Sequence, residues 1–252
     1  MIGQAQLQAK LQSYSTLQLL PKVNLVVGQA GSGRHTFIKE IADKYHLSAL
    51  PFTLNDSFDE AALSIRYIDL AELALKDQAK LIALTEQPPL MCWLFIIGEH
   101  LDLINKTLVG KCEIWLLKPY TQDELTTFLP HGADMVQTLQ IAHTPGQVLK
   151  ANQVPELFKL CETIVEKMSL ANFANALTLA NKIAYKGEAD KFDLDLFFNC
   201  MLQVTAEKNQ EDLFLITLDY QKKSRYKRLV LQNLVESYII DLWRNAYGYS
   251  RT

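Results

Sequence analysis

Cysteine is scarce in this sequence, and long apolar runs are absent. The 252 residues include four cysteines that lie far apart and form no Cys-x-x-Cys pair: Cys92, Cys112, Cys161 and Cys200. This spacing argues against a zinc site and is typical of a reduced protein. Apolar stretches such as 90–98 are too short to span a bilayer, and residues 1–6 lack the basic and apolar regions of a signal peptide. We therefore expect a cytoplasmic protein with no membrane partner.

Neither sign of charge is in large excess. The chain has 25 basic and 28 acidic residues, a net charge of −3, which excludes a polycation that coats nucleic acid. The five histidines show no His-x-x-His or His-Glu-x-x-His spacing, so we do not expect a zinc enzyme. One dense basic segment, residues 222–228, is either a solvated turn between helices or a contact with DNA or an acidic partner.

The patterns before about residue 150 alternate between two kinds. Short apolar runs predict buried strands at 23–27, 50–54, 91–97 and 113–117. Helical spacing occurs at 7–20, 36–45 and 70–85, and 59–66 is a weaker helical candidate. Residues 67–69 fit either a short strand or part of a longer helix, and Thr121 to Glu124 form a capping-box pattern that opens a helix. Strands separated by helices predict a parallel sheet with helices on both faces.

The strand pattern disappears from Val154 onward. Helical patterns follow one another at 155–169, 170–185, 194–204, 211–224 and 226–246, and residues 186–190 resemble a linker. These patterns predict an all-helical second domain. Its apolar faces include Phe197, Phe198, Leu215, Leu231 and Tyr238. Either a core within the chain or burial against neighbouring subunits explains them.

The most informative segment is the loop from Gly28 to Thr36, which follows the apolar run 23–27 and opens a helical pattern. That strand–loop–helix context is what a phosphate-binding loop of the Walker A type requires. Gly28, Gly31 and Gly33 let successive backbone N–H groups and the helix N-terminus face an anion, and Ser32 lies between the last two.

Two positions of this loop depart from what ATP hydrolysis requires. A Lys normally reaches the outer phosphates and a Ser or Thr holds Mg²⁺, but Arg34 and His35 stand at these positions. Arg can still bind phosphate, whereas a neutral imidazole is a poor ligand for Mg²⁺. Thr36 comes one residue late and points elsewhere on the helix. Binding of ATP or ADP remains open, and we do not expect Mg²⁺ to be held productively.

Several segments, taken in order, resemble AAA+ clamp-loader subunits, most closely the delta-prime subunit of DNA polymerase III. Ile2-Gly3-Gln4 is similar to the N-terminal box of that family, and the Gly28 loop follows at a suitable distance. The later segments with a counterpart in the family are residues 81–89 after Walker B, 94–99 (sensor 1), 110–112 (the "SRC" motif), 113–125, and 143–149 (sensor 2).

The resemblance also shows where this chain departs from the family. Asp69 is similar to the Walker B carboxylate, or else is an ordinary acid on a helix surface; the Leu70 that follows it cannot activate water. Gly98 and Glu99 stand where sensor 1 has Thr or Asn. Gly110, Lys111 and Cys112 occupy the "SRC" position, so Lys111 replaces the arginine finger; from its own surroundings Cys112 is expected to be a buried strand residue.

Pro145 and Gly146 lie in the sensor 2 region, where Gly146 replaces the Arg of the active subunits. The resemblance therefore implies three parts: a RecA-like P-loop α/β subdomain (1–119), a small helical lid (120–152) and a helical collar for oligomerisation (153–252). It implies a non-catalytic subunit that joins other clamp-loader subunits through its C-terminal helices and acts with them on the sliding clamp and primer–template DNA. The alternatives are an AAA+-shaped regulatory or helicase-loading factor and a weak Mg²⁺-dependent ATPase.

Overall fold

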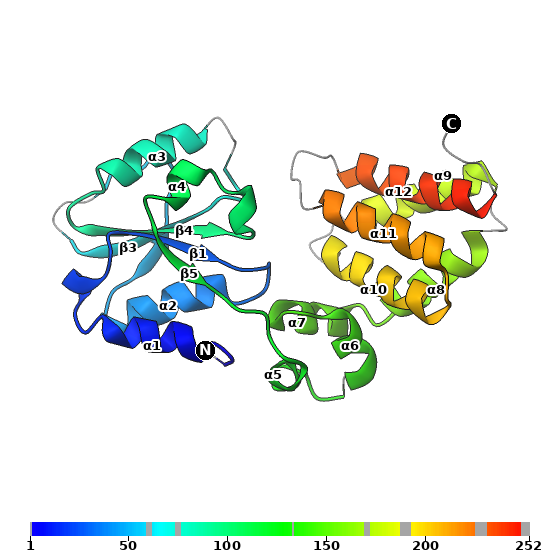
Figure 1. The fold of residues 1–252 in the computed structure, drawn as a ribbon, viewed down its shortest axis with the longest axis horizontal. Coiled ribbons are helices and arrows are strands. Elements are labelled where there is room, and N and C mark those ends of the chain that lie inside the picture. Colours follow the sequence, from blue (N-terminus) through cyan, green and yellow to red (C-terminus); the bar gives the residue numbers. More distant parts are fainter. Residues whose placement is uncertain are drawn as a thin grey trace. The chain divides into compact units, whose positions relative to one another are not determined.

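The chain folds into two compact units, Met1–Glu124 and Leu125–Thr252 (Figure 1). The computed structural model describes residues 2–58, 62–73, 77–132, 134–168, 172–186, 193–224 and 231–247. The division between the units falls near the predicted start of the lid, and the two predicted domain boundaries stay predictions.

The first unit is built on a five-stranded sheet in the order β2-β3-β4-β1-β5, and all its strand pairs are parallel. The strands are β1 (Val23–Val27), β2 (Ala49–Pro51), β3 (Ser64–Asp69), β4 (Cys92–Gly98) and β5 (Glu113–Leu116). The helices are α1 (Ala5–Ser13), α2 (Arg34–Lys44), α3 (Gln78–Glu86) and α4 (Lys106–Val109), with short 3₁₀ turns at Leu17–Leu19 and Leu101–Leu103. The predicted parallel α/β sheet is confirmed.

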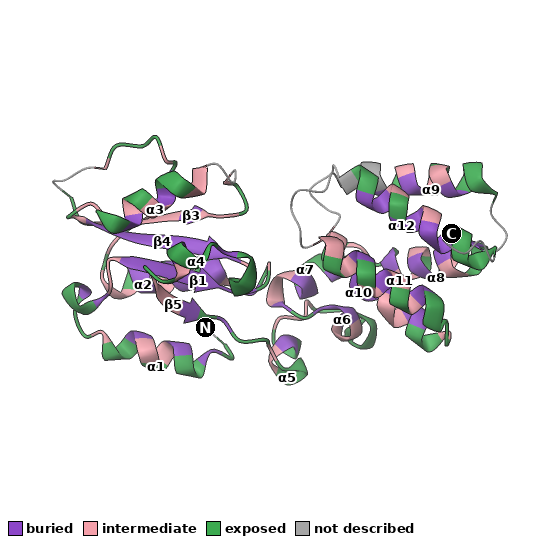
Figure 2. Cartoon of the chain, turned by 45° about the horizontal axis from the view of Figure 1, so that its top comes forward, coloured by how far each residue is buried: buried purple, intermediate pink, exposed green. Residues whose placement is uncertain are grey.

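Helices cover both faces of this sheet because its central strands are apolar throughout. β1 and β4 are buried along their whole length (Figure 2), so alternate side chains enter two separate cores. One core joins the sheet to α1 and α2 and includes Phe37 and Phe95; the other joins it to α3 and α4 and includes Leu81 and Leu94. The result is a three-layer arrangement.

The structure settles one open alternative in the first unit and corrects three expectations. Residues 67–69, left open between strand and helix, belong to strand β3, because Ile65 and Ile68 are buried in the cores on the two faces of the sheet and the strand pairs with β4. Residues 64–66 are therefore not helical, and residues 59–61 lie outside the described residues. The helix expected from residue 70 begins only at Gln78, and the helix expected over 7–20 ends at Ser13.

Every regular secondary-structure element in the described residues of the second unit is a helix, as the sequence predicts. Its helices are α6 (Met135–Ile141), α7 (Pro145–Gln153), α8 (Leu157–Met168), α9 (Phe173–Lys186), α10 (Leu194–Glu207), α11 (Glu211–Ser224) and α12 (Leu231–Ala246); a short helix α5 (Gln122–Thr126) crosses the division between the units. The amide of the Asn199 side chain on α10 donates to the carbonyl of Ile141 at 2.8 Å. The predicted lid helices α6 and α7 thus share a compact unit with the later helices.

The aromatic side chains of the second unit form its core. Phe197, Phe198 and Tyr238 are fully buried, and the Tyr238 ring lies edge-to-face with both phenylalanines. The Tyr238 hydroxyl lies 2.9 Å from that of Thr217. For these three residues, packing within the chain decides between the two explanations that the sequence left open. Leu215 is 54% exposed, and the side chain of Leu231 lies outside the described residues.

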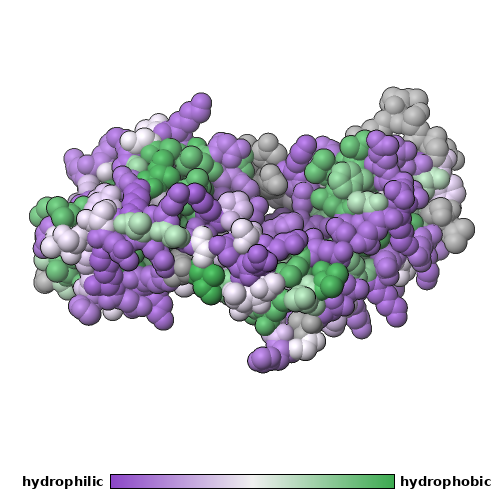
Figure 3. Space-filling model, turned by 60° about the horizontal axis from the view of Figure 1, so that its bottom comes forward, coloured by the Kyte–Doolittle hydropathy of each residue, from purple (hydrophilic) through white to green (hydrophobic). Residues whose placement is uncertain are grey.

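Within the described residues, no helix is long and apolar enough to cross a membrane. On the face drawn in Figure 3, hydrophobic side chains gather in small separate patches among hydrophilic ones. The predicted linker beyond residue 186 and most of the basic segment, residues 225–228, lie outside the described residues.

A buried polar pair anchors the sheet and gives a stability test. The Asn24 side chain in β1 accepts a hydrogen bond from the Trp115 indole N–H at 2.9 Å and donates to the carbonyl of Pro21 at 2.7 Å. We predict that Asn24→Val lowers the free energy of unfolding by about 1–3 kcal/mol, because it leaves a buried donor without a partner.

Chemical denaturation of Asn24→Val, Trp115→Phe and the double variant measures this effect. Since Trp115→Phe removes the donor itself, the double variant should lose less stability than the two single losses added together. Strict additivity would contradict the role assigned to this hydrogen bond.

Candidate nucleotide-binding site

The glycine-rich loop leaves the carboxyl end of β1 and turns directly into α2. The N–H of Gly28 donates to the carbonyl of Gly98 at 3.2 Å, so the loop starts beside the end of β4. Gly31 and Gly33 have φ of 78° and 95°, backbone angles that favour glycine. Gly33 is the N-cap of α2, which begins at Arg34, slightly earlier than the sequence predicts. The local geometry is that of a phosphate-binding loop.

Two donors in this loop are buried without a hydrogen-bond partner. The guanidinium Nη1 of Arg34 and the hydroxyl of Ser32 have none among the described residues. Arg34 is 7% exposed and Ser32 is 4% exposed. A Cβ on Gly28 would lie only 2.7 Å from the Ser32 hydroxyl, so this hydroxyl packs against the glycine backbone within the loop. Because buried donors normally find a partner, this pair fits a phosphate group.

Arg34 has a carboxylate nearby within the same unit. Its Nη2 lies 3.8 Å from Oε1 of Glu99, an ion pair beyond hydrogen-bond distance. Glu99 directly follows Gly98, the last residue of β4. A Cβ on Gly98 would lie 2.4 Å from Cδ1 of Ile104, so a larger residue here would displace the end of the Ile104 side chain. The structure thus brings both sensor 1-like residues to the loop.

The residues expected to concern Mg²⁺ lie at the start of α2 and at the end of β3. Thr36 is exposed, as is His35, whose ring lies edge-to-face against Tyr67 with centroids 5.3 Å apart. The His35 Nε2 is 4.0 Å from Oδ2 of Asp69. Asp69 ends strand β3, so its alternative placement on a helix surface is wrong.

This donor set does not fit a productive Mg²⁺ site. Oδ1 of Asp69 already accepts a hydrogen bond from the N–H of Ala71 at 2.7 Å, and its other oxygen faces His35. The position of the Mg²⁺-binding hydroxyl holds an imidazole, which hard cations disfavour. No cluster of three or more His, Cys, Asp or Glu side chains that could hold a metal occurs in the described part of the chain.

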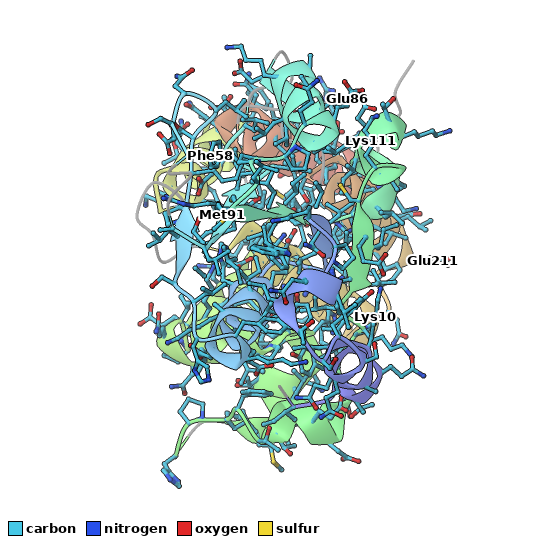
Figure 4. The ribbon with its side chains drawn as sticks, turned by 90° about the vertical axis from the view of Figure 1, so that its left-hand side faces the viewer. Lys10, Phe58, Glu86, Met91, Lys111 and Glu211 are labelled. Carbon is cyan, nitrogen blue, oxygen red and sulfur yellow. The ribbon has the colours of Figure 1, made fainter. Side chains whose placement is uncertain are left out.

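Gly110, Lys111 and Cys112 lie between α4 and β5, and Lys111 contacts helix α3. The Lys111 ammonium pairs with Oε1 of Glu86 on α3 at 3.0 Å, and Figure 4 shows the two side chains beside each other. Cys112 precedes β5 and is partly buried, which corrects its expected place within a strand. Burial raises the pKa of the Cys112 thiol to about 11, so it is protonated and unreactive near neutral pH.

Pro145 and Gly146 open helix α7 in the second unit. Thr144 is the N-cap and accepts from the N–H of Gln147 at 3.3 Å, while the Gln147 side chain accepts from the N–H of His143 at 2.8 Å. This reciprocal capping explains the Thr-Pro-Gly sequence locally, because Pro favours the first helical position.

Sequence reasoning missed one residue that supports the loop from behind. The Tyr120 hydroxyl donates to the carbonyl of Ser32 at 2.9 Å. The segment that carries Tyr120 is held by Gln4, whose side-chain amide makes two hydrogen bonds to the backbone of Lys118, at 2.9 and 3.0 Å. The position of Tyr120 in the sequence could have indicated this contact. Tyr120 comes shortly after β5, and β5 pairs with β1, the strand that leads into the loop.

Comparison with known proteins identifies the fold and no more. No family model matches the sequence, and no curated protein matches it. Among solved structures, the Holliday junction branch migration motor RuvB of Thermotoga maritima is similar at 15% identity with a TM-score of 0.49, covering 100% of this chain and 90% of that one. A proline-to-glycine variant of the same protein gives a TM-score of 0.50 at 15% identity, covering 100% and 91%. The chain therefore has the AAA+ fold: a P-loop α/β sheet with a C-terminal helical domain.

Proposed function

We propose that this chain is a non-catalytic, delta-prime-like subunit of a DNA polymerase III sliding-clamp loader. The observation that carries the proposal is an AAA+ fold whose phosphate-binding loop has kept its shape and lost its hydrolytic groups. Arg34 faces the chain's own Glu99 at 3.8 Å, and His35 stands at the Mg²⁺-binding position. The ordered motifs from Ile2-Gly3-Gln4 to residues 143–149 supply the resemblance to this family.

Loss of hydrolysis follows from the chemistry of phosphoryl transfer. That reaction depends on positioning, on Mg²⁺ and on a group that orients the attacking water. Leu70 follows Asp69, and the N–H of Leu70 donates to the carbonyl of Ile97 at 2.9 Å, which holds Leu70 at the carboxyl end of β3. An apolar side chain there cannot polarise water.

In this proposal the helical unit joins a collar with the other clamp-loader subunits. The inward face of α11 carries Leu213, Thr217 and Tyr220, and Leu215 lies on its other side, exposed. The complex as a whole would act on primer–template DNA and the sliding clamp in the cytoplasm. Lys111 would face the nucleotide of a neighbouring subunit as a point charge without the planar fork of arginine.

One observation favours a second candidate, an AAA+-shaped regulatory or helicase-loading factor. Lys111 is held by Glu86 at 3.0 Å, and this pair would have to open before Lys111 could act on a neighbour's nucleotide. A regulatory factor has no need of that action. Binding to a helicase in place of clamp-loader subunits would identify it.

We predict that the purified chain hydrolyses ATP in Mg²⁺ only at the background rate. The Lys, the Mg²⁺-binding hydroxyl and the catalytic Glu are all replaced, and each loss alone lowers phosphoryl transfer strongly. A steady-state phosphate-release assay of the wild type and Arg34→Ala checks this. Turnover above background that Arg34→Ala abolishes would favour the weak ATPase and contradict the proposal.

We predict that Leu215→Glu weakens assembly with the clamp-loader ATPase subunits of the same organism. Burying one leucine contributes about 1.5–3 kcal/mol, so the dissociation constant should rise by about 10-fold or more. The matched control is Leu90→Glu in the first unit, where Leu90 is 80% exposed and Leu215 54%. Co-purification followed by native mass measures both variants. Loss of the complex with Leu90→Glu alone would point away from the helical collar.

A further inference from the structure

We propose that the loop binds a diphosphate group, such as that of ADP, without Mg²⁺, and that Glu99 discriminates against a third phosphate. The inference rests on the proposed non-catalytic character of this site and is independent of the clamp-loader role. It assigns the site a ligand class and names the residue that sets its selectivity.

The loop contains two buried donors that the described part of the chain leaves without a hydrogen-bond partner. The Ser32 hydroxyl and the Arg34 Nη1 are both more than nine-tenths buried and lack partners. They lie on two sides of Gly33, whose φ of 95° turns the chain into α2. Backbone N–H groups at this turn add the positive end of an eleven-residue helix. A phosphate placed here completes hydrogen bonds that the folded chain leaves open.

The same site needs no metal ion to neutralise its ligand. A guanidinium stays charged at every accessible pH and can bind a phosphate through two N–H groups. Arg34 is buried, so its guanidinium is already positioned beside the loop before a ligand binds. Oδ1 of Asp69 accepts the Ala71 N–H, and the nearest side chain at the Mg²⁺-binding position is the His35 imidazole, a poor ligand for Mg²⁺ that lies 4.0 Å from Oδ2.

Glu99 limits how many phosphates the site accepts. The cation at this loop position reaches the outer phosphates of a bound nucleotide. In this chain that cation is Arg34, whose Nη2 lies 3.8 Å from Oε1 of the Glu99 carboxylate. A third phosphate would bring a second anion to a position that already has one, and like charges in a partly buried site repel strongly. A diphosphate is one group shorter and leaves the pair with Arg34 intact.

The backbone places Glu99 at the carboxyl end of β4, beside the loop. It follows Gly98 directly, and the Gly98 carbonyl accepts the N–H of Gly28 while its Cα packs against Ile104. The side chain of Glu99 is 27% exposed, compared with 8% for Arg34. The Glu99 backbone and the loop thus lie at the same end of the sheet.

The test is isothermal titration of the full chain in EDTA with ADP, pyrophosphate and ATP. We expect ADP to bind in EDTA and added Mg²⁺ to bring no gain in affinity. We expect ATP to bind about 10-fold or more weakly than ADP, which corresponds to about 1.4 kcal/mol. Equal affinity for pyrophosphate would assign the recognition to the diphosphate alone, and tighter binding of ADP would add the nucleoside; both support the inference.

Glu99→Gln should raise the affinity for ATP by about 10-fold and that for ADP much less, because one like charge is removed. The matched control, Asp43→Asn, removes a negative charge from the exposed far end of the same helix α2 and should change neither. Circular dichroism establishes that the variants are folded. If Glu99→Gln does not fold, the ratio of the wild-type affinities for ADP and ATP still tests the inference.

Binding that requires Mg²⁺, equal affinity for ADP and ATP, or no binding by any of the three ligands would overturn the inference. None of these results bears on assembly with clamp-loader subunits, which is measured by co-purification. Conversely, a chain that binds ADP in EDTA and ignores those subunits would keep this inference and remove the proposed clamp-loader role.

Discussion

The enclosure of strand β1 is the constraint on which the rest of the first unit depends. All five of its residues are buried, and it pairs with β4 on one side and β5 on the other. The hydrogen bonds continue beyond the strand ends, from Gly28 to Gly98 and from Leu117 to Val27. The loop therefore has a fixed origin between two neighbouring strand ends. Arg34 and Glu99 lie close together because the segments that carry them follow the carboxyl ends of two neighbouring strands, β1 and β4.

Much of the fold follows from local sequence, and the contacts between distant segments do not. Apolar runs located the central strands, and the capping box was confirmed by both hydrogen bonds between Thr121 and Glu124. Residues 67–69 stayed ambiguous because pairing with β4, which no local pattern reveals, makes them a strand. The ion pair of Arg34 with Glu99 and the support of Ser32 by Tyr120 likewise depend on which strands are neighbours.

The phosphate-binding shape of the loop does not depend on the residues at the Mg²⁺-binding and water-activating positions. Its shape comes from positive φ angles at Gly31 and Gly33 and from the close packing of Ser32 on Gly28. None of these features involves the groups that activate water or hold Mg²⁺. The substitutions at positions 34 and 35 alter chemistry without altering the turn, because both residues already lie in helix α2.

The most direct test of the account is clamp loading onto primed DNA by the clamp-loader ATPase subunits of the same organism, measured with and without this chain. The account predicts that loading requires the chain and that an Arg34→Ala chain supports it as well as the wild type, since ATP hydrolysis belongs to the other subunits. Loading that proceeds equally without the chain would contradict the central claim that it is a working, non-catalytic part of the loader.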